Sequence, residues 1–406
     1  MIAALGVSIV FLGIGRIELA SGGVSVSAWS VSRTTFFFWL GFKFLRLARG
    51  GWNAGKPRDW QPHAPLGLFF LAVTLSLLPD FRQSGDYRYF FFGCAHVVML
   101  VDLFSQAPQR RWLPVILGLT PLVLVLRGFA DDPSILNFTL SQRFAFPLDH
   151  PNTAGYLFAM SIPLCAVVAI VSRRWWRRIS VASCASQIVA LILTFSRGAW
   201  LGWAASVFFL AFLSRKWIFL ALSLLLTAAS VLTFSSIQDR LVSMVQPRDD
   251  PSLRERLQLF SGSLSVGMEN PLLGVGYGRG RLKEALRPHL KGTALEQSPI
   301  WHTHNVYLEL LAGTGFLGLL TFLGLIGTTL LRVLSAAWTR QGAQRLVGFA
   351  LAASWVAAIV AAAGDVPFYH HETRIFFFSL LGAAQIYYSA ADAVDALPMT
   401  VNAPRK

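Results

Sequence analysis

Long hydrophobic stretches dominate this chain, and short polar segments separate them. A helix needs roughly 20 mostly apolar residues to cross the roughly 30 Å hydrocarbon core of a bilayer. The pattern therefore predicts about twelve membrane-spanning helices. The apolar runs lie at residues 2–15, 27–42, 65–78, 89–104, 112–126, 153–171, 179–195, 198–213, 217–234, 305–331, 346–363 and 375–388.

Composition supports an all-α integral membrane protein. The 406 residues are 54% hydrophobic and only 14% charged, with a mean hydropathy of +0.55, which excludes a single soluble core. No Lys or Arg precedes the first apolar run and no small-residue cleavage site follows it, so we expect a retained helix rather than a signal peptide. Cys94, Cys165 and Cys184 lie within apolar runs without a Cys-x-x-Cys pair, which predicts packed thiols and neither disulfide nor zinc.

The net charge of +15 is informative once it is divided between the two membrane faces. With twelve spans, basic connections at 43–58, 110–111, 173–178, 215–216 and 332–345 share one face with the C-terminal Arg405-Lys406. The positive-inside rule assigns that face and both termini to the cytoplasm. The remaining cations face outwards, against the membrane potential, and predict an anionic ligand there. They are Arg88, Arg127, Arg143, Arg197, Arg240, Arg248, Arg254, Arg256, Arg279, Arg281, Lys283, Arg287 and Lys291.

The longest polar stretch divides the chain into a membrane domain and an outer cap. We expect nine membrane helices in residues 1–234, a periplasmic loop with short helices in 235–303, three more membrane helices in 304–391 and a cytoplasmic tail in 392–406. In the cap, Ser252 is a candidate N-cap for a helix over 253–264. A glycine-rich turn at 270–278 follows, and then a basic helix over 279–290.

A polar loop enters a membrane helix at His304-Asn305. An imidazole with an ordinary pKa of about 6.5 accepts a proton near neutral pH, so His304 is a candidate general base. The alternative is an interfacial histidine that only helps Thr303 or Asn305 to cap the helix. His302 is the second candidate for the base.

Arginines at four other places on the outer side suit phosphate oxygens. Arg197 lies in a polar break between two apolar runs, where snorkelling to lipid headgroups is the alternative. Arg143 comes before His150 and Asn152, although Pro151-Asn152-Thr153 is also a plain helix start. Arg254 and Arg256 share one segment, with a solvated amphipathic helix as the alternative. Arg88, at another helix end, is the weakest candidate.

Metal chemistry has little support in the sequence. The outer acidic pairs, Asp131-Asp132 and Asp249-Asp250, each precede a proline and are typical of turns. The outer histidines and one glutamate follow no standard ligand spacing. These residues are His302, His304, His370, His371 and Glu372. We therefore expect no metal and no cofactor.

Several motifs occur together in order from about residue 140 to 320. They are Arg143 with His150-Pro151-Asn152, Ser196-Arg197-Gly198-Ala199-Trp200, Arg256 with Phe260, Asn270-Pro271-Leu272-Leu273-Gly274-Val275-Gly276, and His304-Asn305 with Gly313-Thr314-Gly315-Phe316-Leu317-Gly318. In this order they resemble the O-antigen ligase and polymerase superfamily of bacterial envelope proteins. The resemblance implies a fold similar to the GT-C type glycosyltransferases, in the inner membrane with a periplasmic active site.

The resemblance also implies a reaction. Such proteins move a glycan from undecaprenyl diphosphate to an acceptor, which in the ligases is a sugar hydroxyl of the lipid A core of lipopolysaccharide. The resemblance assigns activation of the acceptor hydroxyl to His304. It assigns binding of the diphosphate to Arg143, Arg197 and one or both of Arg254 and Arg256. The further substrate contacts expected are Asn305, His150, Asn152, Arg88 and His302. Two departures are the duplicated histidine at His302, which leaves the choice of base open, and Phe260, where tryptophan is common.

A histidine base and arginines on the leaving diphosphate would make the transfer inverting and metal-independent. Within the superfamily that the chain resembles, protein-directed members often carry an added C-terminal region after the last helix, so the resemblance favours the lipid A-core ligase. The alternatives are an O-antigen polymerase, a protein O-oligosaccharyltransferase and, in a different class, a flippase or exporter of the lipid diphosphate. Membrane lipids are expected partners, and nucleic acid is not.

Overall fold

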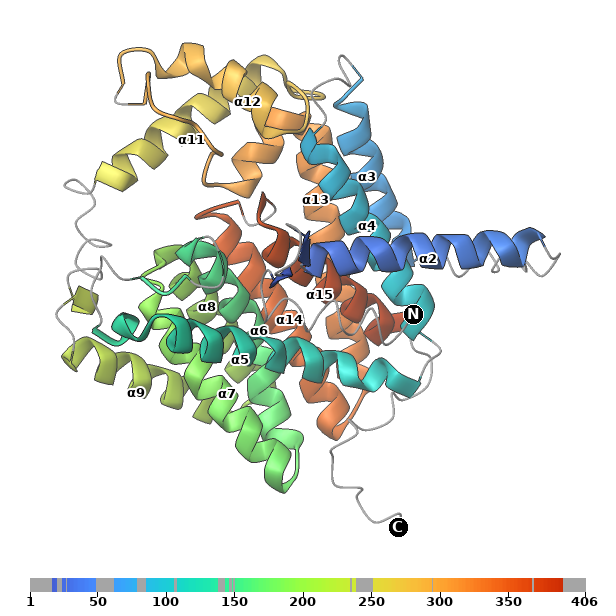
Figure 1. Ribbon diagram of the computed structural model, residues 1–406, viewed down its shortest axis with the longest axis vertical. Helices are drawn as coiled ribbons and strands as arrows, with labels where there is room; N and C mark the ends of the chain where they lie inside the picture. The colour runs from blue at the N-terminus through green and yellow to red at the C-terminus, as the bar shows by residue number, and fades with distance from the viewer. Residues whose placement is uncertain are drawn as a thin grey trace.

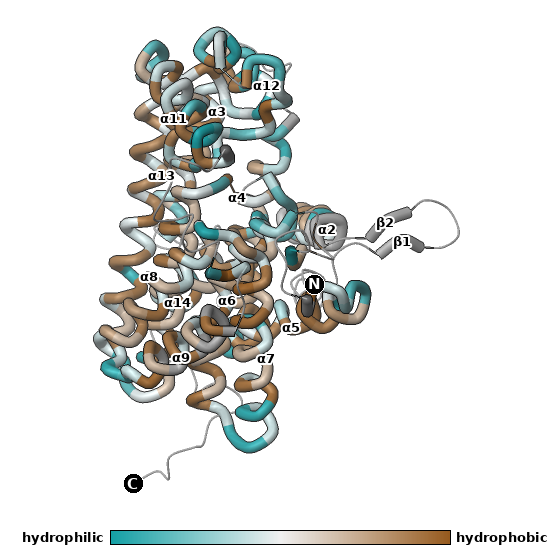
Figure 2. Tube along the Cα trace, turned by 90° about the vertical axis from the view of Figure 1, so that its left-hand side faces the viewer, coloured by the Kyte–Doolittle hydropathy of each residue, from teal (hydrophilic) through white to brown (hydrophobic). Residues whose placement is uncertain are grey.

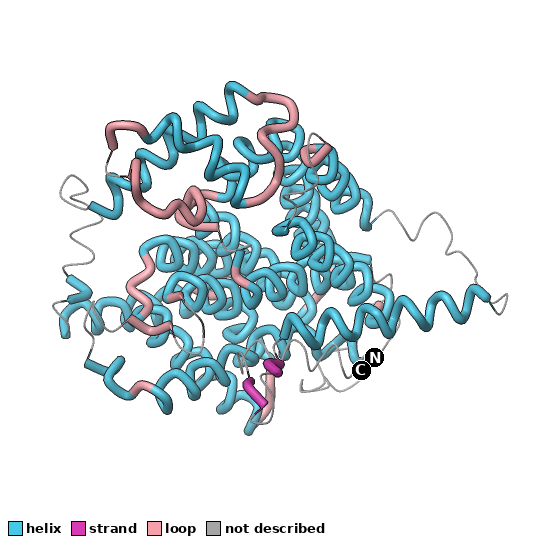
Figure 3. The backbone as a smooth tube through the Cα atoms, turned by 45° about the horizontal axis from the view of Figure 1, so that its top comes forward, coloured by secondary structure: helices cyan, strands magenta, loops and turns pink. Residues whose placement is uncertain are grey.

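The structure is a computed structural model that describes residues 17–19, 24–26, 28–48, 62–78, 85–105, 108–137, 143–145, 148, 150–233, 236–238, 251–293, 295–366 and 369–389. Helices make up nearly all of the described chain (Figure 3). Two three-residue strands, β1 (Ile17–Leu19) and β2 (Val24–Val26), pair antiparallel with Ile17 opposite Val26. The prediction of an α-helical membrane protein is therefore confirmed at this level.

The helices follow the apolar runs along the chain. The first group is α2 (Ala28–Ala48), α3 (Ala64–Leu75), α4 (Gly85–Phe104), η3 (Pro108–Trp112), α5 (Leu113–Asp131), η4 (Pro133–Asn137), α6 (Pro151–Val171), α7 (Arg174–Leu193), α8 (Arg197–Ser214) and α9 (Ile218–Thr233). The second group is α11 (Pro251–Glu269), α12 (Arg279–Leu286), η6 (Arg287–Leu290), α13 (Val306–Thr339), α14 (Gly342–Ala362) and α15 (His371–Ser389).

Seven helices of the described chain are long and apolar enough to cross a membrane. These are α4, α5 with the end of η3, α6, α7, α8, α13 and α14. The run at 65–78 forms the shorter helix α3, which has 12 residues. The run at 2–15 lies outside the described residues, as does the tail at 392–406. Twelve spans therefore remains a prediction, and the described part supports a multi-pass membrane protein.

The packing centre is α6. Its residues are buried along nearly the whole helix, and it packs against α5, α7, α8 and α14. Pro151 at its first turn and the His150 side chain, which accepts a hydrogen bond from the Asn152 N–H, explain why the helix begins there. Cys94 and Cys165 are buried free thiols, and Cys184 is a half-buried one.

A backbone break divides α13. Gly315 has φ 64° and ψ −169°, which is not helical, and the preceding glycine turn docks at this break. The Phe316 N–H donates to Pro271 O at 2.7 Å, and the Val275 N–H donates to Ala312 O at 2.9 Å. A Cβ at Gly315 would lie 2.3 Å from the Leu272 carbonyl carbon. The glycines thus permit the close backbone approach that the sequence predicts.

The cap contains α11, α12 and η6 above one end of the membrane helices (Figure 1). The first cap helix is longer than the predicted 253–264 and begins at Pro251, so Ser252 is inside the helix and is not its N-cap. Proline is favoured at a first helical position, which explains the earlier start. The basic helix predicted at 279–290 ends as an α-helix at Leu286 and continues as a 3₁₀ turn.

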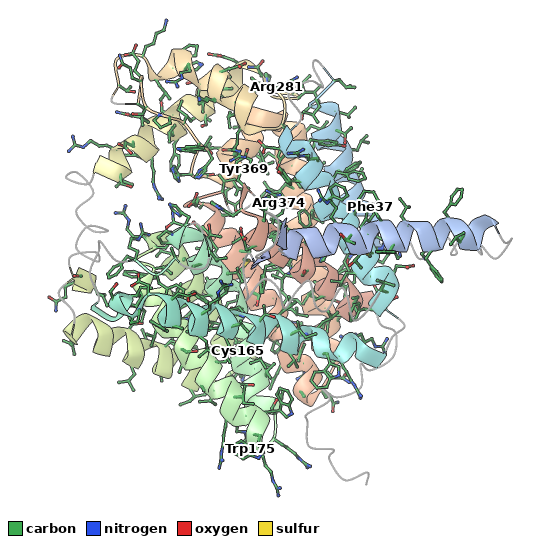
Figure 4. The ribbon with its side chains drawn as sticks, in the orientation of Figure 1. Phe37, Cys165, Trp175, Arg281, Tyr369 and Arg374 are labelled. Carbon is green, nitrogen blue, oxygen red and sulfur yellow. The ribbon has the colours of Figure 1, made fainter. Side chains whose placement is uncertain are left out.

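The two ends of the molecule differ in polarity. Hydrophilic residues gather around α12 and at the far end of α7 (Figure 2). Figure 4 places Tyr369 beneath the cap and Trp175 at the opposite end. The basic α6–α7 connection thus lies away from the cap, as the charge pattern predicts.

Candidate active site

The histidine loop, residues 302–305, lies directly before α13. The Asn305 side chain caps this helix by accepting hydrogen bonds from the N–H groups of Tyr307 and Leu308, at 2.9 and 3.0 Å. The Thr303 N–H donates to Glu309 at 2.8 Å and fixes the loop from the other side. His304 has φ 56°, a left-handed conformation that is uncommon for a residue other than glycine. The surrounding hydrogen bonds therefore hold His304 in a strained backbone position.

Asp365, just beyond α14, is the partner of this loop. Its Oδ1 lies 3.2 Å from His304 Nδ1 and 3.5 Å from His302 Nδ1. A carboxylate only accepts hydrogen bonds, so His304 donates through Nδ1–H and its Nε2 is left as the proton acceptor. The side chain of His304 is 29% exposed, whereas those of His302 and Asp365 are 12% and 6% exposed. His304 is therefore the more accessible of the two histidines.

The electrostatics assign different states to the buried members of the cluster. Burial acts to raise the pKa of Asp365, but the hydrogen bond from His304 and the nearby His302 outweigh it, and this pKa lies below its ordinary value. Burial lowers the pKa of His302 to about 3, against the attraction of Asp365. Near neutral pH, Asp365 is a carboxylate and His302 is neutral. The negative charge is thus available to stabilise a proton on His304.

A second chain of hydrogen bonds reaches Asp365 from α6. The Asn152 Nδ2 donates to Asp365 Oδ2 at 2.6 Å, and Arg143 Nη2 donates to Asn152 Oδ1 at 3.1 Å. Arg143 Nε also donates to Thr194 O at 2.8 Å, at the end of α7. The rings of His150 and His370 stack with centroids 6.1 Å apart. These contacts bring Arg143, His150 and Asn152 to the Asp365 side of the cluster.

The segment between α14 and Asp365 also meets α11, α13 and α8. Arg256 Nη1 donates to Gly364 O at 2.7 Å, and Asn305 Nδ2 donates to Ala363 O at 3.2 Å. At the start of α8, a Cβ on Gly198 would lie 3.5 Å from the Gly364 Cα. Arg197 is the residue directly before Gly198 and is half-buried. Arg256 therefore contacts the short segment that ends at Asp365, and Arg197 adjoins a residue that packs against the same segment.

Two predicted site residues lie elsewhere. Arg254 is exposed on α11, two residues from Arg256. Arg88 is exposed at the start of α4, where its guanidinium lies 4.9 Å from the centre of the Tyr89 ring. Among the described residues, neither arginine makes a hydrogen bond or ion pair with His304 or Asp365, and their role in the site stays a prediction.

Sequence reasoning missed Asp365, together with the buried pair of Glu309 and Tyr369. Tyr369 donates a hydrogen bond to Glu309, which also receives the Thr303 N–H. One signal for Asp365 was available, because an acidic residue at the end of an apolar run usually has a functional reason. Its partners lie 61 and 213 positions away in the chain, and a sequence pattern does not connect such distances.

The donor set His302, His304 and Asp365 is also compact enough to hold a cation, with its ligand atoms within 4.8 Å of one another. The same three side chains are also connected by hydrogen bonds. Asp365 accepts from His304, Asn152 and the Val366 N–H, and His302 Nδ1 accepts from the His304 N–H at 3.3 Å. In this arrangement the proton on His304 Nδ1 and the proton of the His304 backbone N–H point at ligand atoms that a metal would need.

Fold and site together define a multi-pass α-helical membrane protein with a carboxylate–histidine pair flanked by arginines at one end of its helices. Residues 182–323 match the family model described as O-antigen ligase, which supports a relation to the O-antigen ligase/polymerase superfamily. The matched segment contains Arg197, Arg256, His302 and His304. No curated protein matched the chain.

Proposed function

We propose that the protein is an O-antigen ligase. It transfers a glycan from undecaprenyl diphosphate to a sugar hydroxyl of lipid A-core, at the periplasmic face of the bacterial inner membrane. The observation that carries the proposal is the 3.2 Å contact between His304 Nδ1 and Asp365, which leaves His304 Nε2 as a base at a membrane boundary. The family match supports the same class of reaction.

In the proposed reaction, His304 Nε2 takes the proton of the acceptor hydroxyl while its oxygen attacks the anomeric carbon of the donor sugar. The bond between that carbon and the diphosphate oxygen breaks, and the electron pair leaves with the undecaprenyl diphosphate. Attack opposite the leaving group inverts the anomeric centre. Asp365 acts as a positioning residue, because it orients the imidazole and stabilises its positive charge without touching the substrate.

The leaving diphosphate needs cations, and Arg256 and Arg197 are the residues that we assign to it. Guanidinium groups bind phosphate oxygens in a bidentate way and stabilise charge that develops as the bond breaks. Arg143 is the third, although two hydrogen bonds to protein groups already hold it. The reaction needs no metal, since a base and a charge-stabilising group are both supplied by side chains.

The decisive experiment uses the substitution His304→Asn with purified protein, an undecaprenyl diphosphate glycan and lipid A-core. Asparagine tolerates the left-handed conformation at φ 56° and cannot act as the base. We expect an unchanged melting temperature, retained donor binding and a turnover reduced by about 10²- to 10⁴-fold. Turnover close to that of the wild type would contradict the assignment of the base.

Control reactions separate the other functions. Movement of the lipid diphosphate across vesicles by the His304→Asn variant, without any transfer by the wild type, would indicate a flippase. Transfer to a second glycan or to peptide serine would indicate a polymerase or a protein-directed enzyme. Loss of product on adding a chelator would overturn the metal-free mechanism and point to the cluster of His302, His304 and Asp365.

Arg256 and Arg254 form a matched pair for the donor site. Arg256 reaches Gly364 beside Asp365, whereas Arg254 is exposed two residues away. We expect Arg256→Gln to weaken donor binding by about tenfold or more, the value of one hydrogen bond to a charged group. Arg254→Gln should have a smaller effect. Titration of each variant with the donor measures both, and a larger effect at Arg254 would contradict this assignment.

A further inference from the structure

A cavity lies at the end of α14 opposite the histidine loop. It is a partly open cavity whose free space, including the part open to the surroundings, is about 490 Å³, and it is formed where η3 and the start of α5 meet the start of α14 and the end of α15. Its lining residues on α14 extend to Leu351, and the rest of this helix, about 17 Å long, separates them from the end near Asp365. The cavity is therefore a second site, on the face that the charge pattern assigns to the cytoplasm.

Apolar side chains from three helices form most of the cavity wall. Leu113 comes from α5, Val347 and Leu351 from α14, and Ala383 and Ile386 from α15. These residues belong to helices that pack side by side, so the cavity is a gap between helices. A wall of this kind accommodates a hydrocarbon chain.

Cations form the polar part of the same cavity. Arg110 and Arg111 line it from η3, and none of the described lining residues is acidic. The Nε of Arg111 is buried and has no hydrogen-bond acceptor among the described atoms. Arg340 adds a third positive charge beside the lining residue Tyr387, since its guanidinium lies 3.9 Å from the centre of that ring. A buried guanidinium nitrogen without an acceptor is costly, and an anion would relieve the cost.

We propose that this cavity binds an anionic phospholipid of the cytoplasmic leaflet. The phosphate accepts hydrogen bonds from Arg111 and Arg110, and one acyl chain lies against the apolar wall. Basic pockets between membrane helices on this face suit such headgroups. A net negative lipid is favoured over a zwitterionic one, because the cavity lining has arginines and no described acid to pair with an ammonium group. The bound lipid would join α5 to α14 and α15.

Native mass spectrometry of the full-length purified protein tests the proposal, with phosphatidylglycerol as the probe and phosphatidylcholine as the comparison. We expect the wild type to retain phosphatidylglycerol and to lose phosphatidylcholine. Arg111→Gln should weaken phosphatidylglycerol binding by about tenfold or more. The control Arg173→Gln removes an equal charge from the exposed connection before α7 and should change binding little.

A second variant keeps both arginines and fills the cavity. Ala343 is a half-buried lining residue at the start of α14, and Ala343→Trp places a large ring in the cavity. We expect this variant also to lose phosphatidylglycerol. Equal retention of the lipid by wild type, Arg111→Gln and Ala343→Trp would overturn the proposal. Equal losses in Arg111→Gln and Arg173→Gln would overturn it too, because they would indicate unspecific attraction. Displacement of the lipid by millimolar inorganic phosphate would assign the cavity to free phosphate instead.

Discussion

Asp365 fixes the orientation of the His304 ring and the nitrogen that carries its proton. Without the carboxylate, either nitrogen of His304 could carry the proton, and the imidazole would have no fixed orientation. With Oδ1 at 3.2 Å from Nδ1, the Nε2 atom becomes the acceptor, and the charge that forms on the ring has a buried counter-charge. The same carboxylate holds Asn152 through its second oxygen, so one residue couples the loop to α6.

Replacing this carboxylate by its amide, Asp365→Asn, should therefore slow the chemical step more than it weakens binding. We expect turnover to fall by about 10²- to 10⁴-fold with a KM that changes little, because the stabilised imidazolium exists only during the reaction. Steady-state kinetics measures both. The control is Asp131→Asn, which removes an exposed carboxylate that pairs with Arg127 at 3.4 Å. Equal losses in the two variants would show that Asp365 has no specific role.

His302 predicts a dependence of stability on pH. Its pKa is about 3 in the folded protein, below the ordinary 6.5, so between these values the unfolded chain binds a proton that the folded protein does not. Burial of the neutral His302 ring therefore costs no stability of the folded protein above pH 6.5. As the pH falls below 6.5, the unfolded state gains stability by binding this proton, and the folded protein becomes less stable. Acidification from pH 7.5 to 5 should cost about 2 kcal/mol through this residue.

Thermal unfolding of wild type and His302→Gln at several pH values measures this effect. The wild type should lose more stability on acidification than the variant does, because glutamine does not titrate. Parallel pH dependences for the two proteins would mean that His302 is solvated and not buried as a neutral ring.

The starts of helices could be predicted from the sequence where neighbouring residues determine them. Asn305 and Pro151 mark helix starts in the sequence, and both helices begin there. The break in α13 was not predicted, because apolar residues continue through Gly315 and the cause is a turn more than 40 positions away, at Leu272. Asp365 was missed for the same reason, because its partners are far away in the chain, whereas Arg197, Arg256 and His304 could be proposed from their residue types and local sequence.

Two glycines of α13 form a matched test of this break. Gly315→Ala puts a Cβ 2.3 Å from the Leu272 backbone at a positive φ, so we expect a loss of about 1–3 kcal/mol or more. Gly324→Ala meets no atom within 4 Å and should gain about 0.5–1 kcal/mol, since alanine is the better helix former. Melting temperatures of the two variants should move in opposite directions. A stable Gly315→Ala protein would mean that α13 is straight.

Across the whole molecule, Asp86 is one of the residues that connect the cap to the membrane helices. Asp86, in the first turn of α4, accepts hydrogen bonds from the Arg279 N–H at 2.9 Å and from its guanidinium at 3.1 Å. The Arg279 guanidinium also lies 4.9 Å from the centre of the Tyr369 ring, and Tyr369 donates to Glu309. Glu309 holds Thr303, so contacts continue from the cap to the histidine loop.

Asp86→Asn should therefore loosen α12 and the histidine loop together. The side chain of Arg279 is 41% exposed, so we expect a loss of only about 1–2 kcal/mol, equal to about 5- to 30-fold faster amide exchange in both segments. Hydrogen exchange followed by mass spectrometry measures this. Arg287→Gln is the control, because in the described structure that arginine donates to Glu296 O, inside the cap. Faster exchange in α12 alone would separate the cap from the loop, and Tyr369 and Glu309 would then hold the histidines without help from Arg279.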